Sequence, residues 1–389
     1  MKIKVLFLIA GVLVFLLSSF GVSSAAVKAK GKVTREKLSA LAGGDLVNLS
    51  LSSVASESGE IFVLVRDAKS KKRDLGWILY NPSANKIVKR GRCPFDYENK
   101  LVAISPNARY AAAFSRFPAA LHVLDLKDSS WKRLYTNPAP SESGLAIFEL
   151  LGGNSTQDSP LAFIDDSTIV SVFHDMELKD GEKNTRDFVS VFFDASGKKK
   201  MEKGMTFTEC LSVGEKAVRA SGVSLVDSLA ASDMIPVGFN KFVMVMKSGP
   251  RNFLVLFENG SAKIIDSTSS SSIEFLSLRK SDGSIFYMVS PSDKNKNGKL
   301  YKELKAFRNG EISVVDSGRI FGGMFPENGR VILVKVSDTG KTYDIFVVGK
   351  SGKQERIAST SKYARFDTGS AKNVLYLVSH DEIYWVSFM

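Results

Sequence analysis

The stretch LVAISPNARYAAAFSRFPAALHVLDLKDSSWKRLY, residues 101–135, divides into four short apolar runs separated by polar turns. The runs cover 101–104, 110–115, 121–126 and 131–135. The segments between them are rich in the Pro, Asn, Asp and Ser residues that form turns. Short apolar runs bounded by such turns are typical of β-strands, so we predict a four-stranded antiparallel unit here.

The same order of strands and turns returns along the chain. Residues 273–316 repeat it, with Ser-Asp-Gly and Arg-Asn-Gly at the hairpin turns, and residues 319–358 repeat it again. Asp-Gly and Asn-Gly are strong hairpin signals because they tolerate the positive φ that two-residue turns need. Less regular copies cover 46–90, 161–204 and 234–266, and the end of the chain, 363–388, supplies only three strands.

Repeated four-stranded units of about 40–55 residues are what the blades of a β-propeller require. We therefore predict an all-β propeller over residues 46–389 with seven blades, six or eight being the alternatives. A strand from the N-terminal segment 27–45 could complete the three-stranded terminal unit and close the ring. The competing fold is a pair of β-sandwich domains.

Two segments do not fit the four-strand pattern. Residues 205–232 match no blade, which indicates either an insertion or an eighth blade. Residues 34–42, TREKLSALA, are the one helix predicted outside the apolar leader. The scarcity of helical patterns argues against an α/β nucleotide-binding fold.

One unit carries a specific resemblance. The residues Ser105 to Tyr110, followed by Ala111 to Phe114 and Leu121 to Leu126, resemble the repeat of TolB-type and WD-repeat-like propellers, S-P-D-G-[KR]-x-[IVL]-A-[FY] followed by L-[WY]-[LV]-x-D-[LV]. The sequence departs from this pattern at Asn107 and Ala108, where those families have Asp and Gly. The resemblance implies the propeller fold and not an activity, since propellers have many unrelated functions.

The N-terminus has the layout of a secretory signal peptide. Lys2 and Lys4 precede an apolar run over 5–17, and small residues end at 24–26. We predict a signal peptide over 1–26, export to the periplasm or the extracellular space, and no membrane insertion after cleavage. An uncleaved anchor is the alternative, because residues 5–22 carry no charge and almost reach bilayer-spanning length.

The net charge of the chain restricts its binding partners. The chain has 53 Lys and Arg against 41 Asp and Glu, a net charge of +12. This excess favours an anionic partner or surface, although it also serves solubility. No basic motif with interleaved aromatic residues is present, so we do not expect nucleic acid. We expect a monomer.

Cys93 and Cys210 are the two cysteines of the chain. They either form one disulfide or remain as two buried thiols.

The sharpest motif resembles a calcium loop. In DKNKNGKLYKEL, Asp293, Asn295 and Asn297 occupy the first, third and fifth positions, and the carbonyl of Lys299 would be the fourth ligand. The final position is Leu304 where a bidentate Glu is expected, so any calcium binding would be weak. The favoured interpretation is a solvated Asn-rich loop, and no other cofactor is predicted.

The connections between second and third strands offer a binding face. They are long at 67–74, 175–186 and 291–300, and they would leave the ring at one edge. Functional residues concentrate on such loops. The candidate ligand-binding residues on this face are Lys71, Lys72, Arg73, Arg116, Arg186 and Arg251.

Catalytic signatures are missing from the sequence. The three histidines are His122, which we interpret as a structural residue within a strand, and His174 and His380, each followed by an aspartate. No G-x-S-x-G motif, C-x-x-C pair or Gly-rich phosphate loop occurs. We therefore predict a non-catalytic binding or scaffold propeller for a protein or an anionic envelope component. The alternative is a propeller hydrolase or lyase acting on sugars or lactones at the axial channel.

Overall fold

The computed structural model describes most of the predicted β-domain. The described residues are 32–37, 52–66, 75–95, 97–115, 120–136, 148–149, 161–171, 174–179, 182–186, 191–198, 202–205, 207–238, 240–279, 282–291, 301–325, 329–349, 352–361, 366–371, 374–379 and 382–387. The signal-peptide prediction lies outside them. Among the described residues no helix has the length and apolar character needed to cross a membrane.

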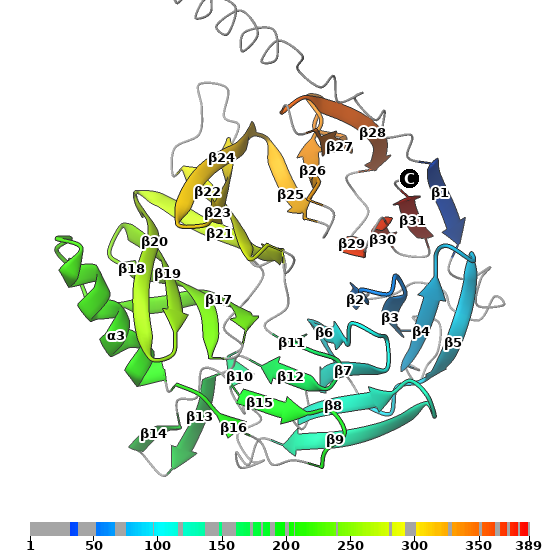
Figure 1. Cartoon of the computed structure of the whole chain (residues 1–389), viewed down its shortest axis with the longest axis horizontal. Coiled ribbons are helices and arrows are strands. Elements are labelled where there is room, and N and C mark those ends of the chain that lie inside the picture. The colour runs from blue at the N-terminus through cyan, green and yellow to red at the C-terminus, as the bar shows by residue number, and fades with distance from the viewer. Residues whose placement is uncertain are drawn as a thin grey trace, which may run out of the picture.

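Small antiparallel sheets are arranged radially around a central axis, as Figure 1 shows. The all-β propeller prediction is therefore confirmed. Six four-stranded blades follow one another along the chain, and we number them 1 to 6. Blade 1 consists of β2 (Ser52–Ala55), β3 (Ile61–Arg66), β4 (Leu75–Asn81) and β5 (Lys86–Arg92). Blade 2 consists of β6 (Tyr97–Ile104), β7 (Tyr110–Ser115), β8 (Ala120–Asp125) and β9 (Ser130–Thr136).

Blades 3 and 4 continue the ring. Blade 3 consists of β11 (Leu161–Phe163), β12 (Thr168–Ser171), β15 (Val191–Asp194) and β16 (Glu202–Lys203). Blade 4 consists of β17 (Ala230–Gly238), β18 (Lys241–Ser248), β19 (Arg251–Glu258) and β20 (Ser261–Ser269).

Blades 5 and 6 come from the two most regular later repeats. Blade 5 consists of β21 (Ser271–Arg279), β22 (Ser284–Pro291), β23 (Lys302–Arg308) and β24 (Glu311–Gly318). Blade 6 consists of β25 (Ile320–Met324), β26 (Val331–Val336), β27 (Thr342–Val348) and β28 (Gln354–Ser361).

The two ends of the chain meet in one further sheet. Strand β1 (Lys32–Lys37) pairs antiparallel with β31 (Glu382–Ser387), and the sheet continues through β30 (Val374–Ser379) to β29 (Phe366–Ala371). Strand β29 contacts both β2 of blade 1 and β25 of blade 6, so this closing sheet lies between them. The prediction of seven blades is corrected to six blades from single stretches of chain, with the closing sheet made from both ends.

The N-terminal strand also corrects the predicted helix over 34–42. Its residues Thr34 to Lys37 belong to β1. Arg35, Glu36 and Lys37 are adequate helix formers, but six register pairs with β31 stabilise the extended conformation.

The extra chain within blade 3 forms its own small sheet. Strands β13 (His174–Lys179) and β14 (Glu182–Arg186) form a hairpin that pairs with β10 (Phe148–Glu149). The long loop predicted over 175–186 is thus mostly strand. This insertion separates β12 from β15 in the sequence without interrupting their pairing.

The segment that matched no blade contains the helix α3 (Phe207–Ala220). Cys210, Gly214 and Val218 recur every four residues and form its buried stripe. The helix contacts β20, the outer strand of blade 4, as seen at the left of Figure 1. Residues 205–232 are therefore an insertion and the start of β17, and not an eighth blade.

The core consists of apolar layers between neighbouring blades, because alternate residues of a strand point to opposite faces of its sheet. Phe62 of blade 1 packs with Ala111 and Ala113 of blade 2, whereas Ala112 packs with Phe163 of blade 3. The small residues of YAAAFS thus allow blade 2 to approach both neighbours closely.

Candidate functional site

A cleft of about 460 Å³ lies between blades 1 and 2. It opens where the β2–β3 and β6–β7 turns meet, and the Ser58 N–H donates to the Pro106 carbonyl at 3.1 Å to join them. We call this side of the ring the turn edge. The strands that flank residues 67–74 meet at the opposite edge, since the strands of a blade alternate in direction. The cleft is lined by Glu60, Leu79, Val88, Lys89, Asn107, Ala108, Arg109, Leu126 and Lys127.

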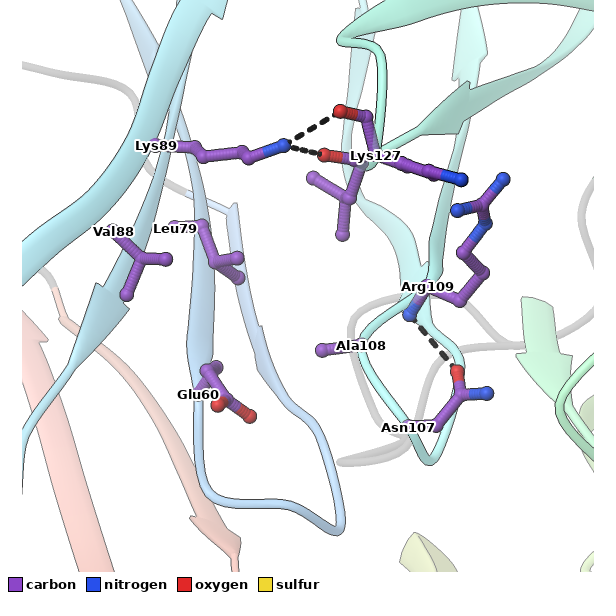
Figure 2. Close-up of a pocket in the computed structure, with 9 residues that line it drawn as sticks. Glu60, Leu79, Val88, Lys89, Asn107, Ala108, Arg109 and Lys127 are labelled. Carbon is purple, nitrogen blue, oxygen red and sulfur yellow. Dashed lines mark hydrogen bonds between the residues drawn. The ribbon is translucent and has the colours of Figure 1, made fainter.

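Both walls of the cleft are apolar in the middle. Leu79 and Val88 come from blade 1, and Ala108 and Leu126 come from blade 2 (Figure 2). Val88 is 43% exposed, although it is a large hydrophobic residue. An organic ligand in the cleft would therefore contact an apolar surface on each side.

Lys89 crosses the cleft from blade 1 to blade 2. Its Nζ donates to the Leu126 carbonyl at 2.5 Å and to the Lys127 carbonyl at 2.8 Å, as the dashed lines of Figure 2 show. An ammonium group has three N–H donors, so one is left beyond these two bonds. Lys89 faces blade 2 because it lies at the β-bulge of β5, where the register shifts between Leu79 and Tyr80.

Glu60 lies on blade 1 at the other end of the cleft (Figure 2). The Ser56 hydroxyl donates to its Oε2 at 2.9 Å, and the Ser58 hydroxyl donates to the same oxygen. These bonds fix the carboxylate within the β2–β3 turn. The second oxygen, Oε1, has no hydrogen bond among those recorded for the described residues.

The blade 2 side of the cleft is the Ser105–Arg109 turn. The Ser105 Oγ accepts the N–H groups of Arg109 at 3.0 Å and Tyr110 at 2.9 Å, and the Asn107 Oδ1 accepts the Arg109 N–H at 2.9 Å. Ala108 has a positive φ of 53°, a conformation that Gly adopts more readily than residues with a Cβ. The polar residues of this sequence motif therefore hold the turn rigid.

The charged ends of Arg109 and Lys127 lie on the blade 2 side of the cleft (Figure 2). The Arg109 Nη2 donates to Asp125 Oδ2 at 2.7 Å, so this cation is paired. The other charged side chains that line the cleft are Lys89, Lys127 and Glu60, with Lys89 and Glu60 at opposite ends. Such a site can bind and orient a ligand.

Most of the predicted ligand residues fall outside the described part of the chain. These are Lys71, Lys72, Arg73 and Arg116, together with Asp293, Asn295, Asn297 and Lys299 of the calcium-loop candidate. Within the described residues no group of three or more His, Cys, Asp or Glu is placed to hold a metal ion.

Two predicted ligand residues are described. Arg186 is the register partner of Asp175 in the β13–β14 hairpin. The Arg251 Nη1 donates to the Ser224 carbonyl at 3.1 Å, which ties β19 to the chain after α3. Neither residue lines the cleft.

His122 has the structural role expected of it. Its ring stacks on Phe95 with 3.8 Å between centroids, and Nε2 lies 3.0 Å from the Ser115 hydroxyl. Burial, together with the smaller effect of the Arg133 charge, lowers the pKa of His122 to about 4. Of the other two, His174 is the register partner of Glu149, and His380 lies outside the described residues.

The structure also decides the state of the cysteines. Cys93 and Cys210 are both buried, and no disulfide joins them. Cys93 packs between blades 1 and 2, and Cys210 packs beneath α3. The second of the two alternatives, a pair of buried thiols, is confirmed.

The comparisons with known proteins identify a fold and not a family. No family model matches the sequence. No curated protein matches it either.

Solved structures resemble the chain in fold. The oligogalacturonate lyase of Vibrio parahaemolyticus has a TM-score of 0.55 at 12% identity, over 92% of this chain and 98% of the lyase. The β-propeller domain of the Trilobed protease from Pyrococcus furiosus has a TM-score of 0.52 at 12% identity, over 87% of this chain and 93% of that domain. The acylaminoacyl peptidase of Pyrococcus horikoshii has a TM-score of 0.53 at 11% identity, over 88% of this chain and 52% of the peptidase. The alignment thus spans about half of the peptidase's length.

These similarities define the class of protein. The chain is a β-propeller. The Trilobed protease propeller has an open velcro topology, whereas here β1 pairs with β31 and joins the two ends of the chain. At sequence identities of 11–12%, these similarities show a shared fold and no shared function.

Proposed function

We propose that the protein is an exported, non-catalytic binding or scaffold propeller for a protein or an anionic component of the cell envelope. The signal-peptide features of residues 1–26 support export to the periplasm or the extracellular space. We also propose that the propeller is of the TolB type, which is supported by the resemblance of Ser105–Tyr110 in one blade.

The observation that carries the proposal is a large excess of cations on a rigid radial scaffold. The chain has 53 basic against 41 acidic residues. A propeller holds its inter-strand connections at two edges, and a net positive protein attracts anionic surfaces over a distance set by the ionic strength. The clustered cations of 67–74 and 291–300 belong to connections between second and third strands, and the strand ends that flank these connections lie at one edge of the ring.

The experiment compares two sets of four substitutions in the full-length protein. The first replaces Lys71, Lys72, Arg73 and Arg186 by Gln. The control replaces four exposed lysines near the turn edge by Gln, so that the net charge falls equally, and these are Lys86, Lys198, Lys263 and Lys353. Binding is measured by co-sedimentation with envelope fractions and with vesicles of anionic or neutral lipid.

We expect the first set to reduce binding to anionic material about tenfold at low salt, and the control set to reduce it much less. Equal loss in both sets would show that net charge alone acts and would contradict a specific face. Unchanged binding in the first set would overturn the proposal.

A further inference from the structure

The cleft between blades 1 and 2 has opposite charges at its two ends and apolar walls between them. Lys89 lies at one end and Glu60 at the other, with Leu79 of blade 1 and Ala108 of blade 2 in between (Figure 2). Val88 and Leu126 add to the apolar lining. The two charged groups do not form an ion pair with each other, because each has hydrogen-bond partners of its own. Lys89 is bound by two carbonyls, and Glu60 by two seryl hydroxyls.

The strand register gives the separation of the Cα atoms of Lys89 and Glu60. Phe62 pairs with Leu79, and Leu79 pairs with Lys89, so Glu60 is two strands across and two residues along from Lys89. With a strand spacing of about 4.8 Å and a rise of about 3.3 Å per residue, their Cα atoms lie about 12 Å apart. An extended tripeptide spans about 10 Å between its ends.

From this arrangement we propose that the cleft binds a short peptide with free ends, of about three residues. The terminal carboxylate accepts the remaining N–H of Lys89, and the terminal ammonium donates to Glu60 Oε1. The middle side chain lies against Leu79, Val88 and Leu126. A volume of about 460 Å³ is within the range of small-molecule sites, roughly 300–1,000 Å³.

Charge and packing argue against other small ligands. A diamine would place one ammonium group beside Lys89 and is repelled at that end. A purely apolar ligand would leave the remaining Lys89 N–H and the Glu60 carboxylate desolvated without partners, which is unfavourable. The peptide's two opposite charges satisfy both ends together.

This proposal is separate from the proposed function, because the cleft opens at the turn edge and the predicted anion-binding face lies at the other. Failure of either one leaves the other unaffected. None of the residues of the first substitution set above lines the cleft.

The experiment is calorimetric titration of the full-length protein with the tripeptide Ala-Leu-Ala, its N-acetyl form and its C-terminal amide. We expect the free tripeptide to bind, and acetylation or amidation to weaken binding about tenfold each, since a hydrogen bond to a charged group contributes about 1.5 kcal/mol.

Glu60→Gln keeps the shape of the side chain and removes its charge. It should weaken the free tripeptide about tenfold and leave the affinity of the N-acetyl form unchanged, because the interacting charge is already absent from that ligand. Lys89→Met should weaken the free and N-acetyl forms and leave the amide unchanged.

Lys89 also joins two blades, so its substitution needs a control for folding. Lys132 is a matched control, because its Nζ donates to the Ser196 carbonyl of the next blade at 3.1 Å and lies outside the cleft. Lys132→Met should lose similar stability and keep tripeptide affinity.

If Lys89→Met fails to fold, Glu60→Gln still decides the proposal. The peptide-binding proposal is overturned if the free tripeptide does not bind at millimolar concentration or if the N-acetyl form binds as tightly as the free form. It is also overturned if Glu60→Gln leaves the affinity for the free tripeptide unchanged.

Discussion

Asp266 and Asp316 occupy the same position in successive blades. Each lies beside a β-bulge of the outer strand, Asp266 in register with Leu254 and Asp316 with Leu304. Each carboxylate binds a lysine of the next blade: Asp266 Oδ2 is 3.1 Å from Lys305 Nζ, and Asp316 Oδ2 is 2.5 Å from Lys335 Nζ.

Lys89 stands at the equivalent position of blade 1, in register with Leu79 beside the bulge. Its Nζ binds carbonyls of blade 2. The bulge thus directs one outer-strand side chain toward the next blade. The residue type at this position differs from one blade junction to another. In blade 1 this position contributes to the cleft.

We expect Asp266→Asn to lower the free energy of unfolding by about 2 kcal/mol. The substitution leaves Lys305 without its carboxylate in a setting where the two side chains are 14–18% exposed, and it weakens the 2.8 Å bond from the Tyr287 hydroxyl. Urea denaturation measures the change. Glu258→Gln, which breaks the more exposed pair with Lys241, is the control and should change stability by less than about 0.5 kcal/mol. Equal effects would contradict a stabilising role for the junction.

His122 should make the protein less stable in acid. Its folded pKa of about 4 lies below the ordinary value of 6.5, because burial disfavours the charged ring. Between these values the unfolded chain binds more protons than the folded one, so stability falls as the pH drops from about 6.5 to 4. The loss should be roughly 2 kcal/mol after allowance for partial exposure.

The measurement for His122 is urea denaturation across this pH range, for the natural chain and for His122→Gln. The variant retains His174 and His380, so these two histidines serve as an internal control. A variant with the same pH dependence as the natural chain would show that His122 is not the responsible group.

Ala108→Gly should stabilise the Ser105–Arg109 turn. Ala108 has a φ of 53°, which costs a residue with a Cβ roughly 1–2 kcal/mol, whereas Gly adopts it freely. Part of this gain is offset by the greater entropy of Gly in the unfolded chain, so we expect a net increase of about 0.5 kcal/mol.

Ala84→Gly is the matched comparison for Ala108, since Ala84 lies in the β4–β5 turn without a positive φ. It should lower stability by about 0.5 kcal/mol. Thermal denaturation of both variants checks the opposite signs, and a decrease in both would contradict the strain argument.

Neither cysteine should react with a thiol reagent while the protein is folded. Burial raises the pKa of the Cys210 thiol to about 12, with Glu209 adding to the effect, and Cys93 is 6% exposed. The thiolate is the reactive form, so modification at pH 8 should be slow in the native state and complete in denaturant. Two reactive thiols per unfolded chain without reductant would confirm that no disulfide forms, and none would contradict it.

Much of the strand order could be predicted from local patterns. Residues 101–135 were divided into four strands whose structural counterparts are β6–β9, and the turns with Asp282-Gly283 and Asn309-Gly310 lie where expected. These predictions depend on alternation and turn chemistry within a few residues. The helix α3 was missed, although Cys210, Gly214 and Val218 at four-residue spacing could have indicated it.

The cleft could not be predicted in the same way. Glu60, Lys89 and Lys127 carry no motif, and the sequence points instead to the cations of the long connections. The nearest signal is the Ser105–Arg109 turn, which indicates the propeller repeat and not a binding site. Nothing within a short window of sequence indicates which turns of different blades meet.

The sequence by itself determined the fold class, the strand units and the rigid Ser105–Arg109 turn, because apolar alternation and turn residues act over a few neighbours. Only the tertiary structure decided the pairing of β1 with β31, the separation of Cys93 from Cys210, and the meeting of Glu60, Lys89 and Leu126 at one cleft. Those relationships join residues tens to hundreds of positions apart, and they follow from how the blades pack around the ring.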